Sequence, residues 1–448
     1  MNPRRMLRSG LLIGATLVIT ISVPKTLATE EISSSGINVD PWKLIVIPPE
    51  DDGPQDREII RWQTKVRSLA DPTEAIENLG WAFVAKARSS FDPGFYKIAE
   101  QCALCLDQKK PGCPEALLLR SHVWNNLHRF KEAEHTAREL VAKRGLDFDY
   151  AVLGDALMEQ GKLTEAAAAY QKMMDQKPGP PAYTRAAHLR WLKGDLTGAI
   201  ELMGWAAGTS TSRDPESEAW TNVRLAHYEW LSQDLPGATN RLTRALALQP
   251  DYPPALLEQG RVLLGLGKTA EAIAVLQKAA ARNPLPEYQW VLIEALRAGN
   301  RLTEAETVET KLCRHGATDD PRTFALYLAT WRENTPLALD LAKAELATRS
   351  DIFTYDALGW AYLANGESTL AWDCAQRAVA EGTQDGRLFL HAGIIASAVG
   401  QSERADLYLE KAKVLQQTLL PSERKLLTAL PGTSRSSSVT SPRNEVSR

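Results

Sequence analysis

Small residues recur at a fixed interval along most of this chain, and this period restricts the possible folds more than any other feature. The 448 residues contain ten alanines that are separated by 33 or 34 residues, with one longer interval of 39. They are Ala99, Ala133, Ala166, Ala199, Ala238, Ala272, Ala305, Ala338, Ala371 and Ala405. Such regularity indicates an array of repeated units rather than the three domains expected at ~150 residues each.

Other residues follow the same period when this alanine is numbered position 20 of each unit. Position 8 is mostly small, although Ile293 and Leu326 depart from the rule, position 15 is often glycine, and position 32 is often proline. The small residues at position 8 are Ser121, Gly154, Ala187, Ala226, Gly260, Gly359 and Gly393. Positions 15 and 32 hold Gly161, Gly194, Gly267, Gly366 and Gly400, and Pro111, Pro178, Pro250 and Pro284.

Each of these positions has a physical role in a helical hairpin. A unit such as 254–284 contains two amphipathic stretches of period 3.6 around a break at Gly267-Lys268. Glycine at position 15 accepts the left-handed conformation that closes a helix, and proline near position 32 ends the second helix. Small residues at positions 8 and 20 let the two helices approach closely. A single hairpin cannot bury its apolar face, so neighbouring units must stack.

This pattern resembles the tetratricopeptide repeat. The residues that carry the resemblance are Leu256, Gly260, Leu263, Ala272, Leu276, Ala279 and Pro284 in one unit, and Tyr355, Leu358, Gly359, Tyr362, Ala371 and Ala378 in another. The resemblance covers residues 73–417, about ten units. It implies an all-α, right-handed α-solenoid with a concave groove lined by the first helix of each unit.

Three departures from the repeat are visible. The first unit carries about seven extra residues around Ser89–Gly94, and about six extra residues near Thr209–Glu216 precede the fifth unit. Glu309 occupies a position where the family prefers a large apolar residue. We therefore expect the seventh unit to be loosely packed.

The first 28 residues have the pattern of an export signal. Arg4, Arg5 and Arg8 precede an apolar stretch at 11–23, and Thr26-Leu27-Ala28 provides small residues for cleavage. Thirteen residues span only about 20 Å of helix, less than the ~30 Å bilayer core. We therefore predict a cleaved signal peptide, with an uncleaved anchor as the alternative. The mature chain is expected to be exported to the periplasm or the extracellular space without spanning the membrane, and the export route stays open.

The segments that flank the array differ from it in composition. Residues 29–56 read as a flexible leader, in which an apolar patch with Trp42 could dock on the first helices, and residues 57–70 as a lone helix. Residues 418–430 are expected to contain a short capping helix. Residues 431–448 are rich in Ser, Thr and Pro, and we expect them to be disordered.

No constellation of catalytic residues stands out. Residues 265–269 end like a phosphate-binding loop, but the loop requires glycine at position 262, which is Val262, and a preceding strand. The seven histidines lack metalloprotease spacing, and no nucleophile elbow is present. Because no segment outside the repeats is large enough for a catalytic domain, we predict no enzyme, no cofactor and no metal site.

Three cysteines form a C-x2-C-x7-C pattern: Cys102, Cys105 and Cys113. Zinc would require a fourth ligand, and the sequence offers none nearby. Packing as small apolar residues is the simplest interpretation, and a disulfide between Cys113 and one of the others is the alternative in an oxidising compartment.

The formal net charge is −3, and the basic residues are scattered. The chain therefore has no basic footprint for nucleic acid, and we predict no nucleic-acid partner.

Aromatic residues gather at the positions that the family resemblance assigns to the groove. Seven of the twelve tryptophans lie there. The predicted partner-binding residues are Trp191, His188, Trp220, His227, Trp230, Trp290, Glu294, Arg297, Tyr327, Trp331 and Trp360. Tryptophan dominates binding hot spots. The alternative is that these rings only pack between neighbouring helices. In the first case, replacing Trp191, Trp230 and Trp290 with alanine should abolish binding and preserve helicity.

The sequence thus favours a non-enzymatic scaffold that binds a peptide or protein partner in a tryptophan-rich concave groove. A solenoid that binds carbohydrate or another small ligand is the alternative, because tryptophan also stacks on sugars. Participation in an envelope complex follows only by analogy with exported repeat proteins.

Overall fold

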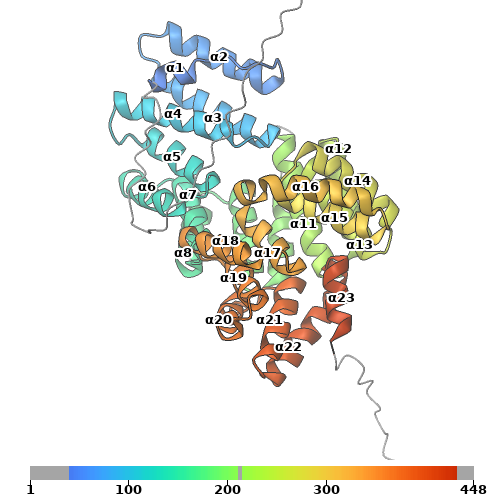
Figure 1. Cartoon of the computed structure of the whole chain (residues 1–448). Coiled ribbons are helices and arrows are strands. Elements are labelled where there is room, and N and C mark those ends of the chain that lie inside the picture. Colours follow the sequence, from blue (N-terminus) through green and yellow to red (C-terminus); the bar gives the residue numbers. More distant parts are fainter. Residues whose placement is uncertain (1–39, 210–213, 431–448) are drawn as a thin grey trace, which may run out of the picture. The chain divides into compact units, whose positions relative to one another are not determined.

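The computed structural model describes residues 40–209 and 214–430. The predicted signal peptide and C-terminal tail lie outside these residues. The described part of the chain contains α-helices and one short 3-10 turn, without a strand (Figure 1). None of its helices has the length and the apolar run needed to span a bilayer. The all-α prediction is confirmed.

Twenty of the helices form ten consecutive hairpins. The first helices of the hairpins are α3 (Thr73–Ser90), α5 (Pro114–Asn126), α7 (Asp147–Glu159), α9 (Pro180–Leu192), α11 (Pro215–Leu231), α13 (Pro253–Gly265), α15 (Pro286–Ala298), α17 (Pro321–Trp331), α19 (Ile352–Ala364) and α21 (Gly386–Ala398). The second helices are α4 (Gly94–Lys109), α6 (Phe130–Lys143), α8 (Leu163–Gln176), α10 (Leu196–Thr209), α12 (Leu235–Leu248), α14 (Thr269–Arg282), α16 (Leu302–Asp319), α18 (Thr335–Thr348), α20 (Ser368–Ala378) and α22 (Ser402–Val414). The two helices of each hairpin pack on each other, and each second helix packs on the first helix of the next unit, as a solenoid requires.

The repeat positions act in the structure as their chemistry predicts. Gly161 and Gly267 at position 15 have φ of 70° and 73°. His128 and Asn300 stand at the same position in units without glycine and adopt φ of 58° and 57°. In these units the turn therefore imposes the left-handed conformation with or without glycine. At position 8, a Cβ on Gly260 would lie 2.4 Å from the Leu276 side chain, so the close approach of the two helices requires glycine there.

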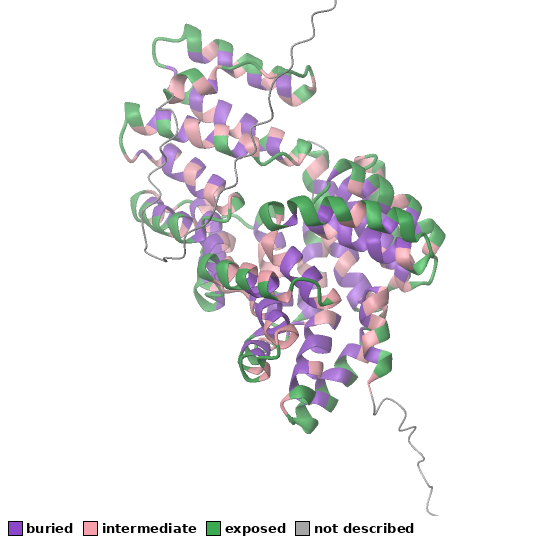
Figure 2. Cartoon of the chain, viewed as in Figure 1, coloured by how far each residue is buried: buried purple, intermediate pink, exposed green. Residues whose placement is uncertain are grey.

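The second helices carry far more exposed residues than the first helices do, as α16 shows clearly in Figure 2. The apolar positions of both helices form the core between and within the hairpins. One continuous cluster of buried residues extends from Leu117 to Leu427. A second cluster covers the N-terminal units and includes Ile45 and Val123.

Helical structure begins at a lower residue number in the leader than the sequence predicted. Residues 41–45 form α1 (Pro41–Ile45), and α2 (Pro54–Ser68) begins before residue 57. Helix α1 packs on α4, where Ile45 is fully buried and Trp42 Nε1 donates to Gln108 Oε1 at 2.8 Å. The predicted end of the flexible leader at residue 56 therefore lies too far along the chain. The apolar patch with Trp42 already docks on the array before that residue. At the other end, a 3-10 turn (Gln416–Thr418) leads into α23 (Pro421–Ala429).

The two insertions in the repeat contact each other. The extra residues of the first unit lengthen α3 to 18 residues, against 13 in α5, so that its end reaches the start of the fifth and sixth units. There Arg88 forms an ion pair with Glu216, and the rings of Phe91 and Tyr252 lie 6.3 Å apart. The insertions therefore build a contact between distant units.

At Glu309, where we expected loose packing, the side chain is held by polar contacts. Arg297 Nη2 donates to both carboxylate oxygens of Glu309 at 2.8 Å, and the Tyr327 hydroxyl donates to the same carboxylate. The Arg297 guanidinium also lies 4.1 Å from the Trp331 ring centroid. A polar cluster thus replaces the usual apolar residue of the seventh unit.

Candidate functional site

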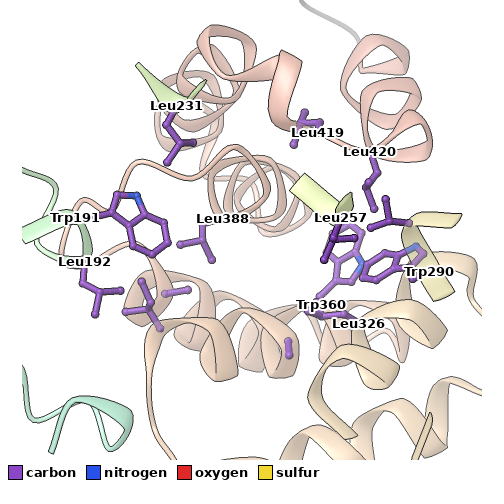
Figure 3. Packing of buried hydrophobic residues seen from close by; sticks show 14 of the residues in the cluster. Trp191, Leu192, Leu231, Leu257, Trp290, Leu326, Trp360, Leu388, Leu419 and Leu420 are labelled. Atoms are coloured by element: carbon purple, nitrogen blue, oxygen red, sulfur yellow. The ribbon is translucent and has the colours of Figure 1, made fainter. Parts of the chain in front are cut away.

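The tryptophans predicted to line the groove are mostly buried within the molecule. Trp191 is 4% exposed, Trp230 4%, Trp290 1% and Trp360 7%. Figure 3 shows Trp191, Trp290 and Trp360 among leucines from other units, including Leu388, Leu419 and Leu420. The inner surface of the middle units is therefore filled by the C-terminal units of the same chain.

The polar atoms of these rings are used inside the molecule as well. Trp191 Nε1 donates to the Gln384 carbonyl at 3.2 Å, and Trp360 Nε1 donates to Thr330 Oγ1 at 3.1 Å. Trp290 Nε1 donates to Glu294 Oε1 at 3.2 Å. For these rings the geometry matches the packing alternative, because neither the ring faces nor the N–H groups are available to a partner.

Hydrogen bonds between distant units hold this arrangement. Ser350 Oγ donates to the Gln160 carbonyl at 3.0 Å, and Thr383 Oγ1 donates to the Leu192 carbonyl at 2.5 Å. Gln417 Nε2 approaches the Trp230 carbonyl at 3.5 Å. The acceptors lie at the C-terminal ends of α7, α9 and α11, where helix carbonyls have no partner within the helix.

The predicted polar residues also contact their own chain. The Arg224 guanidinium lies 3.3 Å from His188 Nδ1, so this nitrogen serves as an acceptor and the imidazole is neutral. Burial, and then the charge of Arg224, lower the pKa of His188 from 6.5 to about 3. His227 Nδ1 lies 2.8 Å from Glu258 Oε1. Tyr327 is buried and belongs with Arg297 to the Glu309 cluster.

Glu294 is 2% exposed but bonds to helix α23. It accepts hydrogen bonds from the backbone N–H of Ser422 at 3.0 Å and from its hydroxyl at 2.6 Å. Burial raises the pKa of Glu294, and the Ser422 donors partly oppose this shift. A predicted partner-binding residue therefore holds a helix of its own chain.

Two predicted tryptophans keep an accessible surface. Trp220, on α11, is 39% exposed, and Trp331, on α17, is partly exposed. The larger exposed ring is one that sequence reasoning missed, because it lies outside the groove positions. Trp205, on α10, is 51% exposed and contacts Tyr183 edge-on, with ring centroids 5.8 Å apart.

A sequence signal could have identified Trp205. It stands at position 26, on the outer face of a second helix. Seven other units carry a charged residue there: Glu139, Lys172, Arg244, Lys278, Lys311, Arg377 and Lys411. At this position a large apolar ring thus stands in place of a charge on the outer face.

No cluster of metal-ligating residues occurs in the portion of the chain that the structure describes. Cys102, Cys105, Cys113 and Cys374 are buried in this structure, whereas Cys313 is exposed. The three N-terminal thiols belong to the core around α4.

A family model described as tetratricopeptide repeat matches residues 126–181, 152–211, 223–285 and 257–320. These overlapping matches fall on the second to seventh hairpins. No curated protein matches the chain.

The chain is also similar to solved structures. One is a monomeric mutant of IFIT1 with m7Gppp-AAAA, at 14% identity and a TM-score of 0.38, covering 81% of this chain and 76% of the other. The human IFIT1 dimer with PPP-AAAA matches at 13% identity and a TM-score of 0.40, covering 80% and 83%. The APC/C hetero-tetramer Cut9-Hcn1 matches at 15% identity and a TM-score of 0.41, covering 87% and 80%.

Proposed function

We propose that this tetratricopeptide-repeat solenoid is a non-enzymatic scaffold of the cell envelope or the extracellular space that binds a peptide or protein partner. The repeats support protein–protein interaction as the general role. The observation that carries the finer proposal is the exposed ring of Trp205. The partner contacts this ring, on helix α10, rather than the tryptophans buried in the inner surface.

Helix α10 differs from the other second helices in ways that suit a contact surface. Glu201 is its only charged residue. A Cβ added to Gly204 or Gly208 would have no atom within 4 Å, so the backbone beside Trp205 is open to a partner. An exposed tryptophan next to accessible backbone offers a large apolar area at a small cost in side-chain entropy.

The proposal is tested with Trp205→Lys, which installs the residue that four other units carry at position 26. The tagged mature chain and the variant are used to capture partners from envelope and secreted fractions, and the captured proteins are identified by mass spectrometry. Loss of a hot-spot ring should weaken binding of the specific partner at least about tenfold, because such residues contribute ~2 kcal/mol or more.

Lys278→Ala is the matched control, since Lys278 stands at the same position on α14. It should retain the partner. Circular dichroism should give the same helicity for all three proteins. Equal capture of the partner by Trp205→Lys and the native chain would refute a role for this surface.

The same variants separate a protein partner from a carbohydrate. Tryptophan fluorescence titrations with oligosaccharides should give no saturable change. Saturable quenching that Trp205→Lys abolishes would instead support the carbohydrate-binding alternative.

The location is tested independently. Cell fractionation and N-terminal sequencing should find the exported chain beginning at Thr29. Leu17→Arg, in the apolar stretch of the signal, should keep the chain inside the cell. An N-terminus that includes residues 1–28 in the exported fraction would favour the uncleaved anchor.

A further inference from the structure

Helix α23 bridges two distant parts of the array. It packs on α21 and α22, as a helix following the tenth hairpin would, and it also packs on α15 of the seventh unit. The 3-10 turn before it contacts α13 of the sixth unit. Helix α23 thus lies against first helices about 130 to 160 residues earlier in the chain.

Three consecutive residues of α23 anchor it to this surface. Ser422 donates its backbone N–H and its hydroxyl to Glu294, as described above. Glu423 accepts from Arg387 Nε at 2.5 Å. Arg424 Nη2 donates to the Leu264 carbonyl at 2.9 Å, at the C-terminal end of α13. The hydroxyl of Ser422 therefore pairs with a carboxylate, the carboxylate of Glu423 with a guanidinium, and the guanidinium of Arg424 with a backbone carbonyl.

The attachment of the helix combines these polar contacts with the burial of Leu427 and of Leu419 and Leu420, which precede the helix. Within α23 only Glu423 and Leu427 are buried. A helix of nine residues is not stable alone in water, so α23 is helical only while it is docked. Undocking would expose the Glu294 carboxylate, the Arg387 guanidinium over the Trp290 ring, and the Leu264 carbonyl.

We propose that the surface beneath α23 is a peptide-binding site, and that α23 is its exchangeable internal occupant. The partner is a protein segment that forms a short amphipathic helix, beginning with Ser-Glu-Arg and carrying leucine five residues after the serine. This chemistry follows from the three anchors and from Leu427. The site is separate from the Trp205 surface, so either proposal can fail without the other.

The test uses a fluorescent synthetic peptide of residues 419–430 and the full chain. Tethered α23 acts at an effective concentration in the millimolar range, so the native chain should bind the free peptide weakly. Ser422→Ala combined with Arg424→Ala weakens the tethered helix and leaves the site intact. Fluorescence anisotropy should then show at least tenfold tighter binding of the free peptide.

Two controls define specificity. Lys425→Ala changes an exposed residue of α23 and should bind the peptide as weakly as the native chain does. A peptide with Glu423→Lys faces Arg387 with a like charge and should bind the double variant at least tenfold more weakly than the native peptide. If the double variant is folded but binds the peptide no better than the native chain, α23 is a permanent cap and the proposal is wrong.

Hydrogen exchange on the native chain provides a test that needs no variant. The amides of α23 should exchange at least tenfold faster than those of α21, because undocking is a local opening. Equal protection of the two helices would overturn the proposal, since α23 would then leave only when the array unfolds.

Discussion

The Thr383 hydroxyl donates a hydrogen bond to the Leu192 carbonyl oxygen, which lies 191 residues earlier in the chain. Thr383 stands at position 32, where four other units carry proline. The eighth and tenth units carry Ser350 and Gln417 at this position, and both contact carbonyls of earlier units. A proline has no such donor. The last three units therefore carry a side-chain hydrogen-bond donor at the position where they contact the earlier ones.

Removing this hydroxyl should weaken the contact between the units. Thr383→Val preserves the shape and leaves the buried Leu192 carbonyl without this donor. We expect a loss of about 1–3 kcal/mol in the free energy of unfolding, measured by urea denaturation. Thr369→Val changes an exposed threonine of α20 and should have little effect. If the two variants have the same stability, the contact contributes nothing to the fold.

The buried and exposed tryptophans should respond differently to truncation. Trp191→Ala removes a buried ring and should cost about 3–5 kcal/mol of stability. Trp220→Ala removes an exposed ring and should change stability by about 0.5 kcal/mol or less. Urea denaturation followed by circular dichroism compares the two variants. A small effect of Trp191→Ala would restore the sequence-based expectation that this ring lines an open groove.

Restoring the family pattern at Glu309 should destabilise the protein. Glu309→Leu places an apolar residue where the repeat prefers one, but it leaves the Arg297 charge and the Tyr327 hydroxyl without their acceptor. We expect the free energy of unfolding to fall by about 1–3 kcal/mol. The value should lie at the low end of this range, because Arg297 and Glu309 keep some solvent contact. In a double-mutant cycle, Arg297→Leu should recover part of this loss. If Glu309→Leu is more stable than the native chain, the polar cluster around Glu309 stabilises the unit less than the apolar residue of the family pattern would.

Acid should destabilise the fold partly through His188. Its pKa is about 3 in the folded chain against 6.5 for the free side chain, so the unfolded state binds more protons between these values. The contribution of His188 is complete above pH 6.5 and is lost as the pH falls toward 3. Urea denaturation at pH 7 and pH 4.5 should show a smaller loss for His188→Gln than for the native chain. An equal loss in both would mean that His188 titrates normally in the fold.

The contacts of the two insertions illustrate what sequence reasoning cannot reach. The extra residues near Ser89 and near Glu216 are visible as breaks in the period, but nothing in either segment indicates that Arg88 and Glu216 form a pair. Trp205 is an intermediate case, between local features that the sequence predicts and distant contacts that it does not. Its position could be identified by comparing units, because charge at position 26 is a property of the repeat.

The sequence alone determined the hairpins, their number and their turns, because these depend on neighbouring residues: the 3.6-residue period, the glycines at position 15 and the small residues at positions 8 and 20. Only the tertiary structure decided which surfaces remain open. Trp191, Trp230, Trp290 and Trp360 occupy the predicted first-helix positions, yet leucines and carbonyls up to about 190 residues away bury them. Contacts at that separation depend on the total rotation along the array, which is the sum of the small rotations between neighbouring units. No local sequence pattern determines this total.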